Sequence, residues 1–131
     1  MTPSKLVNKV AEADFPTFDW TGKTSLQELV AVIAGAHLLI GNETSAVHIA
    51  AAVGTPSVCI TGGGHFGRFV PYVMVYGGTK PVPRVIVEKM DCFICNWHCI
   101  YGAKEGNPFP CIERIAVESV FKAVKEILEQ N

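Results

Sequence analysis

The strongest constraint on the fold of this chain is an alternation of amphipathic and apolar segments between residues 24 and 61. Ser25 and Glu28 have the spacing of a capping box, in which each residue's side chain accepts a hydrogen bond from the other's backbone amide at the start of a helix. Apolar side chains then recur on one helical face, at Leu26, Leu29, Val30 and Ile33. Gly35 follows as a helix stop. A first helix is therefore predicted directly after Thr24.

Two short apolar runs follow, separated by a second helix. Residues 37–40 and 57–61 are too short for helices and are typical of buried strands. The alanine-rich residues 45–53 between them have high helix propensity. Helices and strands that alternate with short connections favour a parallel sheet covered by helices. We therefore expect an α/β fold with three layers, a Rossmann-like parallel sheet of about four to six strands.

The rest of the chain is expected to complete a single domain, residues 1–131, since this length suits one domain and not two. Residues 1–20 are weakly patterned and form a lead-in to it. A third strand is predicted at residues 85–87. Residues 91–111 are rich in cysteine and expected to be irregular, and residues 114–130 carry the apolar spacing of a C-terminal helix.

Composition and charge exclude several classes of protein. Apolar residues make up 49% of the chain and charged residues 18%, which excludes a disordered chain. The net charge of −1 offers no basic excess for nucleic-acid binding, although a small anionic ligand needs only a local pocket. No apolar run is long enough to span a membrane, and the first ten residues lack the apolar core of a secretory signal. We therefore expect a cytoplasmic protein without a membrane span.

The junction between the first strand and the second helix is a candidate anion site. Ligands of open α/β sheets bind at the carboxyl ends of the strands, where a helix start offers free amides and a positive dipole end. His48 could add a side-chain donor, whereas the charge of Glu43 would repel a phosphate unless it points at a sugar hydroxyl. An ordinary junction with a capping Glu43 remains the alternative. The candidate backbone donors are Thr44, Ser45, Ala46 and Val47.

A glycine-rich loop follows the second predicted strand. Gly63 and Gly64 would allow the backbone to approach a ligand closely, and they are candidates to border the same site. A flexible turn is the alternative reading of this loop. His65 is left undecided between ligand contact and ordinary packing. The scattered aromatic residues are candidates for stacking on a base or sugar, but packing in the core or at an interface is favoured for each of Trp20, Phe66, Phe69, Tyr72 and Trp97.

The five cysteines point to a second kind of site. Four of them lie close together in the chain with spacing compatible with a tetrahedral zinc ion, at Cys92, Cys95, Cys99 and Cys111. A disulfide and reduced packing thiols are the other interpretations, and Cys59 is expected to be a buried strand residue. A zinc site here would favour a different function, that of a non-catalytic module in which zinc holds residues 91–111 as a partner-binding platform.

Residues 24–29 and 33–56 together resemble glycosyltransferase family 9, the ADP-heptose:lipopolysaccharide heptosyltransferases and their relatives. The resemblance lies in an acidic residue, a hydroxyl residue, a position that is usually Gly, two variable positions and a histidine, followed by a helix of small residues that ends in Gly-Thr-Pro. Glu43 stands where the family usually has Asp, and Ser45 where it usually has Gly. The resemblance is weaker beyond residue 83.

The resemblance implies that the chain corresponds to the C-terminal, donor-binding half of a GT-B fold. It implies an ADP-heptose-like nucleotide-diphosphate-sugar whose diphosphate lies on residues 44–47, with His48 stabilising the leaving group. Thr24 matches a position against the nucleobase. No metal cofactor would be required.

The resemblance also bears on the partners of the chain. The family's general base belongs to an N-terminal acceptor domain that this sequence does not match, so we expect the chain alone to transfer nothing. Lipopolysaccharide or surface-glycan synthesis would place it at most peripherally at the inner membrane. The uncovered face of the cleft would allow a homo-oligomer.

Overall fold

Three short strands form one parallel sheet in the computed structural model, which describes residues 14–73 and 78–130. The strands are β1 (Leu39–Asn42), β2 (Ser57–Ile60) and β3 (Arg84–Ile86), and β2 lies in the middle. Both pairings are parallel, as predicted. The expected four to six strands are not found, because the part of the chain that the structure describes contributes three.

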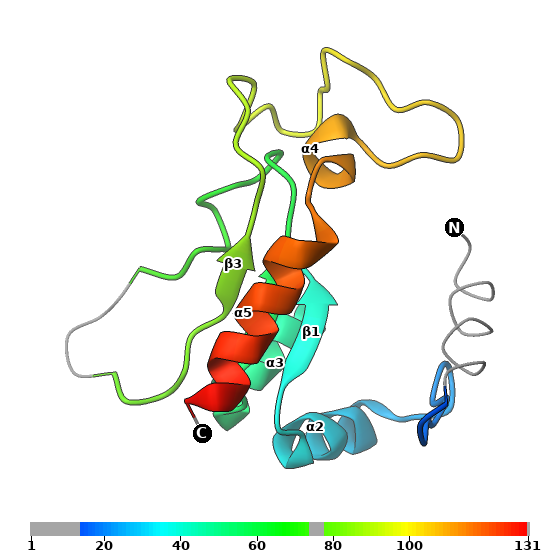
Figure 1. Ribbon diagram of the computed structural model, residues 1–131, viewed down its shortest axis with the longest axis vertical. Coiled ribbons are helices and arrows are strands. Elements are labelled where there is room, and N and C mark those ends of the chain that lie inside the picture. Colours follow the sequence, from blue (N-terminus) through cyan, green and yellow to red (C-terminus); the bar gives the residue numbers. More distant parts are fainter. Residues whose placement is uncertain (1–13, 74–77, 131) are drawn as a thin grey trace.

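Helices cover the sheet on both faces. The helix α3 (Ser45–Val53) packs on β1 and β2, and α2 (Leu26–Gly35) packs on α3. On the other face, α5 (Val117–Glu129) packs on β2 and β3. In Figure 1 α5 lies in front of the sheet and α3 behind it. This arrangement agrees with the predicted three layers and is compatible with a Rossmann-like fold.

The first helix begins where the capping box predicts. The Glu28 amide donates to Ser25 Oγ at 3.2 Å, and the Ser25 amide donates to Glu28 Oε2 at 2.7 Å. The hydrogen bonds from Ser25 lower the pKa of the Glu28 carboxyl, because they stabilise its charged form. At the other end of α2, the Thr55 hydroxyl donates to the Ile33 carbonyl at 2.7 Å. This buried bond joins the end of α2 to the loop before β2.

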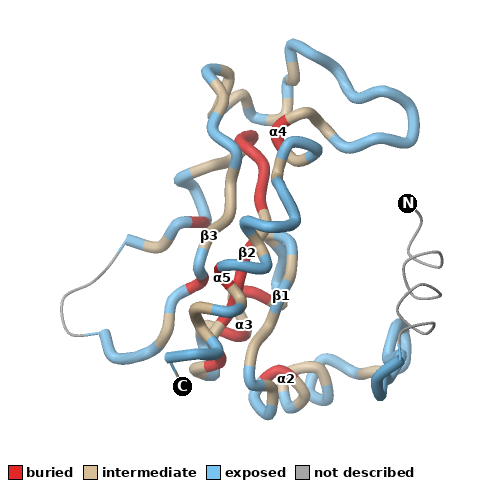
Figure 2. Tube along the Cα trace, viewed as in Figure 1, coloured by how far each residue is buried: buried red, intermediate tan, exposed pale blue. Residues whose placement is uncertain are grey.

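The core lies between β2 and α3. Val47, Cys59 and Val70 are fully buried and touch one another, and Leu39, Tyr72 and Val85 pack around them. Figure 2 shows this buried strip along the middle of the molecule. Cys59 is the buried strand residue that the sequence predicts. Burial, together with the nearby charge of Glu43, raises the pKa of its thiol to about 11.

Element boundaries differ from the predictions in four places, one of which is the end of the second strand, at Ile60 instead of residue 61. The first strand begins at Leu39 and extends to Asn42, because Gly41 and Asn42 pair with Cys59 and Ile60 instead of forming a turn. The third strand is one residue earlier than residues 85–87. The predicted helix at residues 114–130 is found as the shorter α5, and a short helix α4 (Pro110–Glu113), which was not predicted, precedes it.

The flanking segments complete the description. Between residues 14 and 25 the structure contains no helix or strand, in keeping with a lead-in, and residues 1–13 lie outside the described part. Residues 91–109 are irregular, as predicted, whereas the last two residues of the cysteine-rich segment, Pro110 and Cys111, belong to α4. No helix in the described ranges has the length and apolar character needed to cross a bilayer.

Candidate functional site

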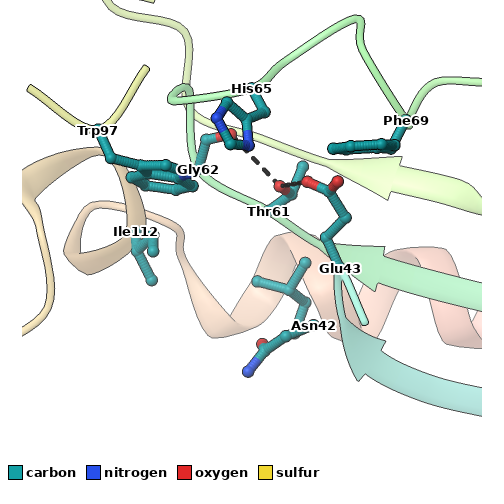
Figure 3. Close-up of a pocket in the computed structure, with 9 residues that line it drawn as sticks. Asn42, Glu43, Thr61, Gly62, His65, Phe69, Trp97 and Ile112 are labelled. Carbon is teal, nitrogen blue, oxygen red and sulfur yellow. Dashed lines mark hydrogen bonds between the residues drawn. The ribbon is translucent and has the colours of Figure 1, made fainter. Parts of the chain in front are cut away.

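A cavity of about 360 Å³ opens at the carboxyl ends of β1 and β2. Ligands of parallel α/β sheets bind at this edge. The cavity combines a carboxylate, an imidazole, a hydroxyl and an amide with aromatic rings, as Figure 3 shows. Its lining consists of Asn42, Glu43, Ile60, Thr61, Gly62, His65, Phe69, Trp97 and Ile112.

A hydrogen bond between two strand ends holds the carboxylate of the cavity in place. The hydroxyl of Thr61, which follows β2 directly, donates to Glu43 Oε2 at 2.9 Å (Figure 3). Thr61 is 4% exposed, and its amide donates to the Ile86 carbonyl at 3.2 Å, so the residue is fixed at the sheet edge. Glu43 is therefore oriented toward the cavity and away from a capping role on α3. A carboxylate held this way can accept hydrogen bonds from ligand hydroxyls.

The imidazole of the cavity is fixed by the cysteine-rich segment. His65 Nε2 lies 2.7 Å from Asn96 Oδ1. The edge of the ring meets Phe69 on one side and Trp97 on the other, with centroid distances of 6.0 Å and 5.9 Å. These three contacts hold the imidazole at the mouth of the cavity.

The helix α3 starts beside this cavity with free amides. Its N-cap residue Thr44 is extended (φ −139°, ψ 177°), and its side chain caps no amide. The Val47 amide donates to the Thr44 carbonyl at 3.2 Å, whereas those of Ser45 and Ala46 donate to no acceptor within the described ranges. The predicted anion site thus retains two unpaired donors and the positive end of the helix dipole.

The other predicted site residues, at the starts of α2 and α3, do not line the cavity. Val47 is fully buried in the core, and Thr24 is half-buried at the start of α2. His48 Nδ1 lies 2.5 Å from Tyr72 Oη, and the two rings are parallel with centroids 5.7 Å apart. Burial raises the pKa of the Tyr72 phenol, so the phenol stays protonated. If the phenol donates this proton to Nδ1, the proton of neutral His48 is on Nε2, which is left as a donor.

The backbone of Gly63 and Gly64 lies against aromatic side chains of the protein itself, whereas the sequence suggested a close approach to a ligand. Both are buried, and a Cβ on Gly63 would overlap the ring of Phe93, while one on Gly64 would overlap the ring of Trp97. The close backbone approach that glycine permits is therefore used to seat the cysteine-rich segment on this loop.

The four clustered cysteines line a second, apolar cavity beneath Trp97, of about 10 Å³. All five cysteines of the chain are free thiols, so the structure forms no disulfide. Within residues 14–73 and 78–130, no three His, Cys, Asp or Glu side chains are arranged to hold a metal ion. Zinc at Cys92, Cys95, Cys99 and Cys111 therefore stays a prediction without geometric support, and the packing-thiol interpretation agrees with the structure.

The comparisons with known proteins bear on this arrangement. The family model of glycosyltransferase family 9 (heptosyltransferase) matches residues 5–82, more than half of the chain. The chain belongs to glycosyltransferase family 9. Neither the search of curated proteins nor that of solved structures returned a match.

The residues that the family model matches form part of the cavity lining. The match includes both strand ends, Glu43, Thr61 and His65. It ends before the cysteine-rich segment, which supplies Trp97 to the lining and Asn96 to the hydrogen bond with His65. Sequence reasoning missed Thr61 and Asn96. Thr61 could have been found, because it follows a predicted parallel strand and must meet Glu43 at the same sheet edge. No local signal marks Asn96 as the partner of a histidine 31 positions away.

Proposed function

We propose that this family 9 chain binds the nucleotide-diphosphate-sugar donor of a glycosyl transfer reaction, of heptosyltransferase type, in lipopolysaccharide or related surface-glycan assembly. The observation that carries the proposal is the cavity at the strand ends, in which Glu43 is held by Thr61 directly before the free amides of α3. A hydroxyl-binding carboxylate and an anion-binding helix start thus lie within three residues of each other.

The diphosphate is assigned to the start of α3. The amides of Ser45 and Ala46 supply hydrogen-bond donors, and the dipole of a nine-residue helix favours negative charge there. Thr44 and Ser45 are exposed, so a phosphate can reach this backbone without displacing core residues. Thr24 is assigned to the nucleobase on the strength of the family resemblance.

The sugar is assigned to the cavity. Its volume of about 360 Å³ is at the lower end of the range for small-molecule sites, so it suits a sugar ring and not a whole nucleotide sugar. The Glu43 carboxylate would repel the diphosphate and accept hydrogen bonds from sugar hydroxyls. One ligand can therefore satisfy both parts of the site.

The chemistry of the transfer fits this placement. As the anomeric C–O bond breaks, negative charge develops on the departing diphosphate, and fixed donors stabilise that charge. The α3 amides would supply this stabilisation, with Nε2 of His48 as a further donor. Attack by the acceptor hydroxyl also needs a general base on the opposite face of the sugar, which we assign to an N-terminal acceptor domain. The chain alone is then expected to bind donor without transferring it.

The backbone amides can be tested directly with Ser45→Pro. Ser45 is the first residue of α3, where proline is favoured, and Thr44 already has the extended conformation that a residue before proline prefers. The substitution removes one amide donor and preserves the helix. Loss of a hydrogen bond to a charged group predicts that ADP, UDP or GDP binds at least about tenfold more weakly, measured by calorimetry.

Ser45→Ala is the matched control, because it removes the hydroxyl and keeps the amide. It is expected to bind the nucleoside diphosphate as the wild type does. Equal affinity of Ser45→Pro and the wild type would refute the placement of the diphosphate, and no binding of any of the three nucleotides by the wild type would refute the function itself.

A further inference from the structure

We infer that the cysteine-rich segment, residues 91–111, completes the sugar site of this chain and selects the sugar that is bound, with Asn96 positioning His65 and Trp97 forming a wall. The inference rests on the proposed donor-binding function and deepens it. It concerns a segment that lies beyond the residues matched by the family. Its ligand is the hydroxylated ring of the nucleotide sugar.

Two backbone hydrogen bonds dock the segment on the glycine-rich loop at the cavity. The Ile94 amide donates to the Gly63 carbonyl at 2.8 Å, and the Asn96 amide donates to the Gly64 carbonyl at 3.0 Å. Ile94, Asn96 and Trp97 all have positive φ angles, of 68°, 52° and 63°. Non-glycine residues in this region are uncommon and cluster at functional sites. The chain therefore holds an unfavourable backbone conformation that places Trp97 at the cavity and Asn96 against His65.

Trp97 is a rigid wall of the cavity. Its ring stacks on Phe109 with centroids 5.7 Å apart and an interplanar angle of 27°, and it also packs over Gly64. The ring cannot move aside, because it is held by both neighbours. Since it lines the cavity beside His65, its edge limits how far a sugar ring can extend in that direction (Figure 3).

Asn96 determines which nitrogen of His65 is available to the ligand. With Asn96 Oδ1 as acceptor at 2.7 Å, the proton of neutral His65 is on Nε2. Nδ1 then carries a lone pair and can accept a hydrogen bond from a hydroxyl. Without Asn96, neutral His65 can carry its proton on either nitrogen, so Nδ1 is no longer fixed as a hydrogen-bond acceptor.

The polar groups of the cavity favour a sugar over a phosphate. Glu43 is an acceptor with negative charge, and His65 in this tautomer is a second acceptor at Nδ1. Two acceptors suit a ligand that presents two hydroxyls, whereas a phosphate needs donors. The segment should therefore affect affinity for the sugar and leave affinity for the nucleoside diphosphate unchanged.

The test compares binding of ADP, UDP and GDP with binding of their glucose or mannose conjugates to the full chain by calorimetry. Asn96→Gly removes the acceptor and tolerates the positive φ, and it is expected to reduce the affinity gained from the sugar about fivefold. Asn96→Asp keeps an acceptor and should restore that gain. Asn107→Gly, a change of the same kind at an exposed residue of the segment, should have no effect.

A second variant tests selection by the wall. Trp97→Phe keeps an aromatic ring against Phe109 and shortens the wall, so it should change the ratio of affinities for different sugars on the same nucleotide. An equal loss for nucleotide and nucleotide sugar in Asn96→Gly, or no gain from any sugar in the wild type, would overturn the inference while donor diphosphate binding stands. Failure of every nucleotide to bind the wild type would overturn both.

Discussion

Replacing Gly64 by alanine tests the contact that brings the cysteine-rich segment to the cavity. A Cβ at this position would lie 2.7 Å from Trp97 Cε3 and closer still to Cδ2 and Cε2. Ordinary carbon contacts are about 3.5–4.0 Å, so the ring would have to move by roughly 1 Å or more. Phe109 stacks against the same ring and restricts that movement. The φ angle of Gly64 is not in the left-handed region, so the effect of alanine is steric.

The magnitude follows from the cost of overpacking, about 1–3 kcal/mol for an added methyl group that its surroundings cannot accommodate. An unfolding entropy of roughly 2.1 cal/mol/K per residue over 131 residues converts each kcal/mol into about 4 °C. Gly64→Ala should therefore lower the melting temperature by about 4–11 °C in a calorimetric scan. Gly35→Ala is the matched control, because its Cβ would meet nothing within 4 Å, and it should leave the melting temperature unchanged or raise it.

A double-mutant cycle with Trp97→Ala identifies the source of the loss. If the indole ring is the obstacle, Gly64→Ala should be close to neutral once that ring is removed. An equal loss in both backgrounds would show that the methyl group clashes elsewhere and that Trp97 does not rest on Gly64. A melting temperature equal to that of the wild type in the single variant would refute the docking of the segment altogether.

Two further predictions concern buried groups of the core. Thr55→Val leaves the Ile33 carbonyl without the hydroxyl that it accepts at 2.7 Å, and it should reduce the free energy of unfolding in urea by about 1–2 kcal/mol, whereas Thr55→Ser should retain most of it. The thiol of Cys59 ionises near pH 9.0 in the unfolded chain, whereas its raised pKa delays ionisation in the folded chain to about pH 11. The contribution of this thiol to the free energy of unfolding is therefore fully present below pH 9.0 and should be lost as the pH rises toward 11. Cys59→Ala should flatten that part of the pH profile, and an unchanged profile would contradict the assignment to Cys59.

The predictions that held depend on local chemistry. The Ser25–Glu28 capping box, the apolar strand runs and the C-terminal amphipathic helix each lie within a few residues of the chain, so their spacing is visible in the sequence. The strand-to-helix junction at Glu43 was predicted for the same reason. The boundaries of β1 were wrong because pairing with β2 extends the strand into residues that have turn propensity.

The partners that the sequence left open depend on contacts between distant segments. The glycines at 63 and 64 permit close approach to any neighbour, and nothing in their own sequence says whether that neighbour is a ligand or the rings of Phe93 and Trp97. The cysteine spacing likewise leaves the direction of each thiol open, and in the folded chain the four thiols line a small apolar cavity. Patterns of spacing therefore indicate which residues could meet, and long-range packing decides which of them do.

The two parts of the cavity have different origins in the sequence, and under the proposed function this difference would let diphosphate binding and sugar choice vary separately. The strand ends and the start of α3 belong to the segment that the family shares, and they carry the carboxylate and the free amides. Asn96 and Trp97 come from a segment outside that match and reach the cavity by resting on Gly64. A change in residues 91–111 can therefore alter the wall of the sugar site without moving the groups assigned to the diphosphate, because the two sets are joined through one backbone loop.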